Sequence, residues 1–229
     1  MQVQFQQSLK AQPRANQIPN VIQESPLYQR GGFVLIDKLL DPANLAQLQR
    51  ESLTLGSQAS ENLMLETDRN AFEIHFGRGG SPARKFLSTQ GGTVQDAFYQ
   101  SITLKTTLET LSQTRINPTG ARGTFSYYAR DGDFLALHRD ILQCDLTLIT
   151  CLFDRTKGAA SSLGGVLRLY PNHNLKPLSS INAQSLSIDL RLEVGQSIAL
   201  LGGIVPHEVL PTVTGQIRIV SVLCFEIQT

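Results

Sequence analysis

The sequence predicts a mainly β protein with flanking helices, folded as a double-stranded β-helix of the jelly-roll, cupin-like type. Two observations favour this class. Helical spacing occurs early in the chain, and from Gly123 onward short β-rich runs alternate with turn residues. Eight short strands at such spacing are typical of a double-sheet jelly roll. The runs cover residues 123–129, 134–140, 145–153, 165–170, 186–190, 196–201, 206–210 and 216–226.

Length and composition indicate one domain. The chain has 229 residues, of which 41% are hydrophobic and 17% charged, as in an ordinary folded protein. All-β domains of this length are common. We expect a single domain over residues 1–229, with a polar N-terminal arm (1–30), a helix-rich support (31–122) and the jelly-roll core (123–229).

The elements before the jelly roll follow from local signals. Residues 32–37 form a short apolar run that predicts a strand. Asp41 suits the N-cap of the helix that follows, and Pro42 suits its first position. Residues 56–91 carry glycines and scattered charge and predict a long loop region with some strand, whereas residues 93–115 show helical spacing.

Charge and leader signals point to no macromolecular partner. The 20 basic and 19 acidic residues give a net charge of +1, without a long block of one sign. We therefore expect no nucleic-acid partner and no membrane-surface helix. The first residues lack the basic and apolar regions of a signal peptide, and no apolar run is long enough to span a membrane. We expect a cytoplasmic protein.

The three cysteines are Cys144, Cys151 and Cys224. They lie in apolar stretches and form no CxxC pair. An odd number in such surroundings indicates buried thiols in a reducing compartment. We therefore expect no disulfide framework.

A possible metal site is the strongest functional signal. In the strand-like run 134–140, alternation puts His138 and Asp140 on one face and sends Arg139 to the other. A later strand can bring His207 beside them. Two imidazoles and one carboxylate form the facial triad of oxygen-activating Fe(II) sites, which leaves part of the metal open. An HxD motif alone is weak, since each histidine could simply be packed in the core.

Arg218 strengthens the interpretation. It lies in the otherwise apolar run 217–225. A buried guanidinium is costly unless an anion meets it, and a carboxylate bound through two hydrogen bonds suits it best. We therefore expect an acidic ligand near Arg218.

Several segments together resemble the 2-oxoglutarate and Fe(II)-dependent dioxygenases, in particular the prolyl 4-hydroxylase-like branch. The resemblance covers most of the chain, with order and spacing in agreement. It is carried by the segments 32–42, 128–140, 146–153, 164–170 and 195–218.

The resemblance implies that His138, Asp140 and His207 bind Fe(II), and that Arg218 pairs with the distal carboxylate of 2-oxoglutarate. The chain is then a single dioxygenase domain, with Fe(II), 2-oxoglutarate and O2 as its cofactor and cosubstrates. The reaction implied is hydroxylation of a substrate C–H bond with release of succinate and CO2. The carboxylate of Asp140 disfavours the related halogenases, in which a small residue makes room for halide.

The remaining residues expected to contact the cosubstrate match the family pattern only in part. Tyr128 matches the family tyrosine that lines the keto-acid pocket, and Thr147 is a further candidate contact. Where the family commonly has a tyrosine on the next strand, this chain has Cys151, so one cosubstrate hydrogen bond is absent or comes from another residue.

The substrate remains open. A small molecule such as an amino acid or a natural-product intermediate is favoured, because no peptide-docking tract is evident. The alternatives are a prolyl or peptidyl hydroxylase, a non-enzymatic jelly-roll binding module, and a cupin that binds another divalent metal. Arg78 and Arg84, with Lys85, could meet an anionic substrate group, whereas His75 and His173 are expected to be surface histidines.

Overall fold

The computed structural model describes residues 20–68, 82–121, 123–155 and 164–228. The helices are α1 (Asn20–Gln23), α2 (Pro26–Gln29), α3 (Pro42–Leu55), α5 (Thr93–Tyr99) and α6 (Ile102–Ser112), with short 3-10 turns at Gly56–Gln58, Glu66–Asp68, Pro171–His173 and Leu178–Ser180. The strands are β1 (Phe33–Ile36), β2 (Ser60–Met64), β3 (Arg84–Gln90), β4 (Arg115–Pro118), β5 (Thr124–Tyr128), β6 (Phe134–His138), β7 (Leu146–Arg155), β8 (Leu167–Leu169), β9 (Ile188–Leu190), β10 (Ser197–Leu200), β11 (His207–Val209) and β12 (Ile217–Gln228). None of the described helices is long and apolar enough to cross a membrane.

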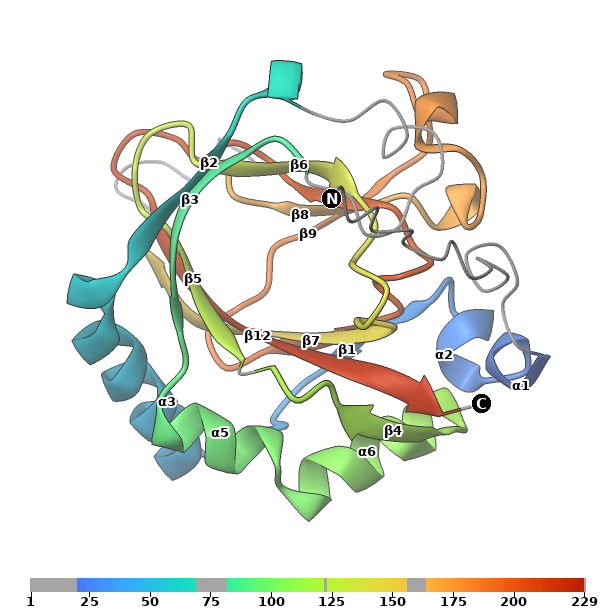
Figure 1. The fold of residues 1–229 in the computed structure, drawn as a ribbon, viewed down its shortest axis with the longest axis horizontal. Coiled ribbons are helices and arrows are strands. Elements are labelled where there is room, and N and C mark those ends of the chain that lie inside the picture. The colour runs from blue at the N-terminus through green and yellow to red at the C-terminus, as the bar shows by residue number, and fades with distance from the viewer. Residues whose placement is uncertain (1–19, 69–81, 122, 156–163, 229) are drawn as a thin grey trace, which may run out of the picture.

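The strands form one curled sheet with the order β1-β10-β7-β12-β5-β3-β6-β11-β8-β9, while β2 pairs with β3 and β4 with β12. The sheet folds back on itself, so that β6 and β8 face β7 and β12 across the interior (Figure 1). Strand β3 joins the two layers because it pairs with both β5 and β6. Each of the eight runs predicted from residue 123 onward contains a strand, and the jelly-roll prediction is confirmed.

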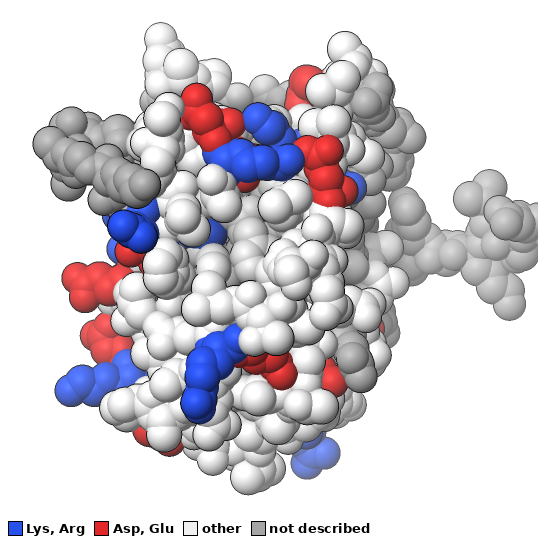
Figure 2. Space-filling model, turned by 90° about the vertical axis from the view of Figure 1, so that its left-hand side faces the viewer, with Lys and Arg blue, Asp and Glu red and all other residues white. Residues whose placement is uncertain are grey.

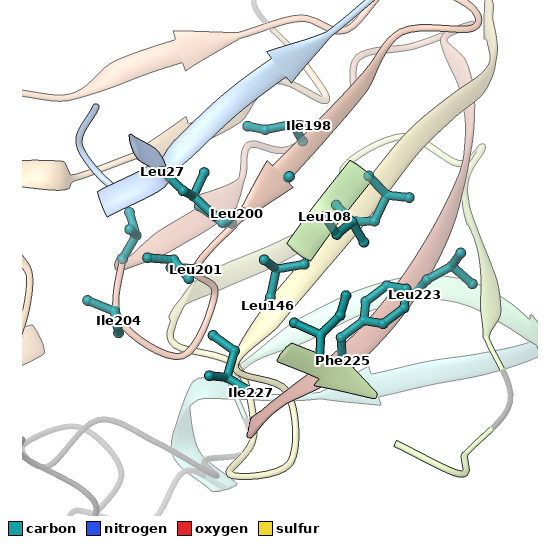
Figure 3. Close-up of a cluster of buried hydrophobic side chains, with 14 of the residues drawn as sticks. Leu27, Leu108, Leu146, Ile198, Leu200, Leu201, Ile204, Leu223, Phe225 and Ile227 are labelled. Carbon is teal, nitrogen blue, oxygen red and sulfur yellow. The ribbon is translucent and has the colours of Figure 1, made fainter. Parts of the chain in front are cut away.

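The main hydrophobic core lies on the helix-covered side of the layer that contains β7, β10 and β12. Figure 3 shows Leu146 of β7 beside Leu223 and Phe225 of β12, with Leu108 of α6 packed against them. All four side chains are essentially inaccessible to solvent. The other face of the same strands is therefore free to line the interior of the jelly roll.

Helix α3 begins as the sequence predicts. Asp41 is the N-cap, and its Oδ1 accepts a hydrogen bond of 2.8 Å from the Asn44 backbone amide. Pro42 occupies the first helical position, where no intrahelical donor is needed. Leu48 is buried between the helix and the sheet, which anchors α3 on the outer face.

Two local predictions differ from the structure. The helical stretch expected over 93–115 is two helices, because the Ser101 side chain accepts a hydrogen bond from the Leu104 amide and starts α6 anew. That helix ends where Gln113 adopts a left-handed φ of 55°, and β4 follows. In the described part of the expected polar arm, Leu27 is 1% exposed and belongs to the core, since α1 and α2 dock there.

The expectation of three free thiols is wrong. Cys144 and Cys224 form a disulfide with a Cα–Cα distance of 5.0 Å, and only Cys151 is a free, buried thiol. Strand pairing explains the bond, because Cys224 is the register partner of Thr147 and the turn before β7 returns Cys144 to the same place. The two cysteines are 80 residues apart in sequence, so their spacing gave no signal. A reducing compartment inferred from free thiols loses its support.

Candidate metal centre

The two histidines meet through strand pairing. His138 ends β6, His207 begins β11, and the two are register partners in the antiparallel pair. Their ring centroids are 4.2 Å apart. Asp140 Oδ1 lies 3.5 Å from Nε2 of His138 and 3.6 Å from Nε2 of His207, and the three candidate ligand atoms lie within 4.8 Å of one another. Arg139 points away, as alternation predicts, and its Nε donates to the Ile204 carbonyl at 2.8 Å.

Backbone carbonyls fix the tautomer of both rings. His138 Nδ1 lies 2.8 Å from the Ala136 carbonyl oxygen, and His207 Nδ1 lies 2.9 Å from that of Val205. A carbonyl can only accept, so each Nδ1 carries the proton and donates. The Nε2 lone pairs are then free for a metal ion, in the arrangement common among metal-ligating histidines.

The Asp140 carboxylate is held from two sides. Its Oδ2 accepts a short hydrogen bond from the Thr147 hydroxyl on β7. Its backbone amide donates to the Gly202 carbonyl at 2.9 Å. Gly202 also leaves the space that the carboxylate occupies, because a Cβ added there would overlap Asp140 Oδ2. The aspartate is therefore placed by contacts from β7 and from the turn that follows β10.

Burial and mutual charge set the protonation of the site. Burial lowers the pKa of His138, and His207 lowers it further, so this imidazole is neutral near pH 7. Burial opposes the charge on Asp140, yet His207 and His138 together hold the pKa of its carboxyl well below the usual range. For His207, burial lowers the pKa, but Asp140 outweighs that effect and raises it. The site thus presents an ionised carboxylate to a cation.

The triad opens into a cavity of ≈ 210 Å³ inside the jelly roll. Apart from His138, Asp140 and His207, its walls combine a few polar groups with many apolar side chains. They are Phe86, Thr124, Ser126, Tyr128, Leu135, Thr147, Ile149, Gly165, Leu167, Val209, Arg218, Val220 and Val222. The metal ligands and Arg218 therefore share one apolar chamber.

Arg218 is the cation in this cavity. It is 3% exposed, and its Nη1 is buried without a hydrogen-bond partner among the described residues. Tyr128 is its register partner on β5, and burial raises the pKa of that phenol, which stays protonated. Phe86 stacks on the Tyr128 ring with centroids 5.2 Å apart. A buried guanidinium with an unmet donor favours an anionic ligand.

Comparison with known proteins identifies the fold. No protein-family model matches the chain, and no curated protein is significantly similar to it in sequence. Solved structures do match. A prolyl-4-hydroxylase from Pseudomonas putida is 18% identical with a TM-score of 0.55, over 86% of this chain and 94% of the other. The alpha-ketoglutarate-dependent non-haem epimerase SnoN from nogalamycin biosynthesis is 15% identical with a TM-score of 0.65, over 91% and 83% of the two chains.

A prolyl hydroxylase from Trichoplax adhaerens, solved with a hypoxia-inducible-factor peptide fragment, has a TM-score of 0.59 at 17% identity, over 90% of this chain and 88% of its own. The chain has the fold of the 2-oxoglutarate and Fe(II)-dependent oxygenases. The identities are low, so this similarity concerns the architecture, and the chemistry must be argued from the site itself.

The site of this oxygenase fold has a donor set suited to Fe(II). Two imidazole nitrogens and one carboxylate are the ligands of the facial triad, and Nδ1 hydrogen bonds already orient both rings. Arg218 lines the same cavity and has an Nη1 without a hydrogen-bond partner among the described residues, which suits a carboxylate of a small diacid. The residues around the cavity therefore fit both Fe(II) and a small diacid.

Most residues proposed from the sequence lie together around this cavity. Besides the triad, Tyr128, Thr147 and Arg218 line the cavity. In the structure the Thr147 hydroxyl bonds Asp140, while its contact with a cosubstrate stays a prediction. Cys151 is buried, and burial raises the pKa of its thiol, although Arg218 opposes this.

The structure gives less support to the residues proposed to contact the substrate. The Arg84 guanidinium donates to the Pro82 carbonyl at 3.2 Å, and its role toward a substrate stays a prediction. Arg78 and His75 lie outside the described residues. His173 is half-buried in a 3-10 turn, with Nδ1 at 3.2 Å from Ser180 Oγ. On the face shown in Figure 2, basic and acidic side chains lie next to one another.

The sequence analysis did not identify three residues that contact or make room for the site residues Asp140 and Arg218. Gly202 has no side chain that could mark it as a site residue, yet the space this leaves is occupied by the Asp140 carboxylate. Asp154 and Arg191 form an ion pair next to Arg218, at 2.9 Å between Oδ1 and Nη2. Asp154 lies on β7 and Arg191 directly follows β9, 37 residues away in sequence, so local spacing does not encode their contact.

Proposed function

We propose that this protein is an Fe(II)- and 2-oxoglutarate-dependent oxygenase that hydroxylates an unactivated C–H bond of a small molecule. The reaction joins one oxygen atom of O2 to the substrate carbon and the other to the cosubstrate, which leaves as succinate and CO2. One observation carries the proposal: the His138, Asp140 and His207 triad lines one buried cavity together with Arg218, whose Nη1 has no hydrogen-bond partner among the described residues.

The residues of the chain have distinct parts in this proposal. His138, Asp140 and His207 would hold Fe(II), and the iron would supply the activation of O2. Arg218 would bind the distal carboxylate of 2-oxoglutarate by charge-assisted hydrogen bonds. The protonated Tyr128 phenol lies on the neighbouring strand, where it can donate to the same carboxylate.

The apolar walls exclude water from the reacting region. Leu135, Leu167 and Val209 lie on the layer that carries the histidines, and Ile149 and Val220 lie on the opposite layer. Between these apolar walls, the triad, Arg218 and a few hydroxyl groups such as that of Tyr128 are the groups that can orient polar reactants. The walls also protect an oxidising site from side reactions with solvent.

Two substrate classes can be compared. SnoN has been solved with Fe3+, alpha-ketoglutarate and nogalamycin RO, a small molecule. The Trichoplax enzyme was solved with a peptide fragment. The higher TM-score belongs to SnoN, 0.65 against 0.59, and supports a small-molecule substrate. A prolyl or peptidyl hydroxylase is the alternative.

The test measures binding before turnover. The full chain, loaded anaerobically with Fe(II), is titrated with 2-oxoglutarate in a calorimeter, and we expect saturable binding that requires the metal. O2 is then admitted with panels of amino acids, aromatic natural-product intermediates and proline-containing peptides, and succinate is quantified. Metal-dependent binding together with succinate formation driven by a small molecule supports the proposal. Absence of metal-dependent binding would refute it, and turnover of peptides alone would replace the small molecule by the alternative.

A further inference from the structure

The buried Arg218 guanidinium is only partly neutralised by the protein. Its nearest carboxylate is Asp154, the register partner on β7, with Nη1 at 3.5 Å from Oδ2. This distance allows charge attraction, yet the two groups are not aligned for a hydrogen bond, and Nη1 has no partner among the described residues. Arg218 is thus close to an anion that does not occupy its donors.

Arg191 explains why Asp154 does not occupy them. Its Nε donates to Asp154 Oδ2 at 3.0 Å, and its Nη2 donates to Oδ1 at 2.9 Å. Both carboxylate oxygens are therefore engaged by one planar fork, the geometry in which arginine binds carboxylates most strongly. The Asp154 side chain is 11% exposed, whereas that of Arg191 is 34% exposed. Arg191 is therefore the partner that lies nearer to solvent.

The charges of Arg218, Asp154 and Arg191 determine how the cavity receives a carboxylate. If Asp154 bonded Arg218 directly, an incoming carboxylate would have to displace it. If Asp154 were absent, the empty cavity would contain an uncompensated buried cation, which is costly. Two arginines and one aspartate leave a net positive charge, and the more buried arginine keeps the open donors. A carboxylate that enters the cavity therefore meets a cation that is held in place but not neutralised.

We infer that Arg191 and Asp154 are positioning residues, which keep the Arg218 guanidinium available to the distal carboxylate of 2-oxoglutarate. This inference rests on the proposed function. Arg191 has the decisive part, because it holds Asp154 away from Arg218. Loss of Arg191 should free Asp154 to pair with Arg218, and the anion site should weaken although neither residue touches the metal.

A double-mutant cycle gives the test. The dissociation constant of 2-oxoglutarate is measured calorimetrically under anaerobic conditions for Fe(II)-loaded wild type, R191Q, D154N and R191Q/D154N, and iron binding is titrated separately. We expect R191Q to weaken 2-oxoglutarate binding about tenfold, the order of one charge-assisted hydrogen bond. The double variant should bind within about threefold of D154N, because the competing carboxylate is gone.

Controls separate positioning from a general loss of structure. R168Q removes a matched bidentate pair, Arg168 with Asp189 at 2.6 Å, on the neighbouring layer, and should leave 2-oxoglutarate affinity unchanged. R191K keeps the charge without the fork and should lie between wild type and R191Q, which preserves the test if R191Q does not fold. Unchanged affinity in R191Q, or a double variant as weak as R191Q, overturns the inference. Wild type that binds no 2-oxoglutarate refutes the proposed function instead.

Discussion

The Thr147 hydroxyl donates a hydrogen bond to the Asp140 carboxylate and thereby connects β7 to a candidate metal ligand that follows β6. Asp140 lies beyond the end of its own strand, so its position depends on such contacts. The carboxylate oxygen that faces the two histidines is Oδ1, while Thr147 holds Oδ2. The hydroxyl therefore selects which oxygen is presented to the metal.

We predict that Thr147→Val weakens Fe(II) binding by roughly tenfold or more, as is typical when a hydrogen bond to a ligand is removed. Valine has nearly the same shape but cannot donate, so Asp140 would lose its orientation. Thr147→Ser retains the hydroxyl and should bind iron like the wild type. Anaerobic metal titration measures both variants, and equal affinity in Thr147→Val would contradict the role assigned to the hydroxyl.

The metal ligands and the anion site should be separable. We predict that His138→Ala loses iron, whereas Arg218→Ala retains iron and weakens 2-oxoglutarate binding by about 1.5–3 kcal/mol, the value of one charge-assisted contact. Metal content after desalting and calorimetric titration of 2-oxoglutarate distinguish the two effects. Equal iron loss in both variants would show that the roles are assigned wrongly.

How much of this site the sequence could predict depends on the range of each interaction. Alternation along one strand places His138 and Asp140 together, and an arginine in an apolar run indicates a buried anion site. Those inferences need only neighbouring residues. His207 was expected beside His138 and Asp140 because a later strand of a jelly roll can return next to the first, and β11 pairs with β6 in this way.

Other contacts could not be predicted because they depend on register between strands that are distant in sequence. The Cys144–Cys224 disulfide forms where β7 lies beside β12, and the Asp154–Arg191 pair joins β7 to the segment after β9. The break between α5 and α6 is a local signal, since Ser101 is a good N-cap, yet the apolar spacing continues across it. In that segment periodicity was the weaker guide.

Gly202 should be intolerant of any side chain. We predict that Gly202→Ala abolishes iron binding, because its Cβ would overlap Asp140 Oδ2 and displace the ligand. The overlap involves the end of a side chain rather than the backbone, so the fold should persist. Metal titration combined with circular dichroism checks this: a folded variant that binds iron normally would contradict it, and Thr147→Ser serves as the conservative control.

The disulfide should stabilise the fold. We predict that Cys144→Ala/Cys224→Ala lowers the free energy of unfolding by about 2–4 kcal/mol, because the bond closes a long loop and restricts the unfolded chain. Urea denaturation measures the change. Dithiothreitol should shift the midpoint of the wild type and leave that of the double variant unchanged. A wild-type midpoint that reduction does not move would count against a stabilising role.

The pair of Arg168 and Asp189 should make a small, acid-sensitive contribution to stability. The hydrogen bond from Arg168 lowers the pKa of Asp189, although partial burial opposes the shift. A lowered pKa means that the stabilisation is present above the pKa of the unfolded aspartate, about 3.9, and is lost as the pH falls through the folded value. Both side chains are partly exposed, so the effect should not exceed about 1 kcal/mol.

Denaturation of wild type and Arg168→Gln at pH 7 and across the acid range measures this contribution. The two stability curves should lie apart at neutral pH and converge as Asp189 becomes protonated, because protonation removes the charge that Arg168 binds. Asp189→Asn should behave like Arg168→Gln and show no further loss in the double variant. A difference that stays constant down to the lowest pH would mean that the Arg168 side chain acts through packing.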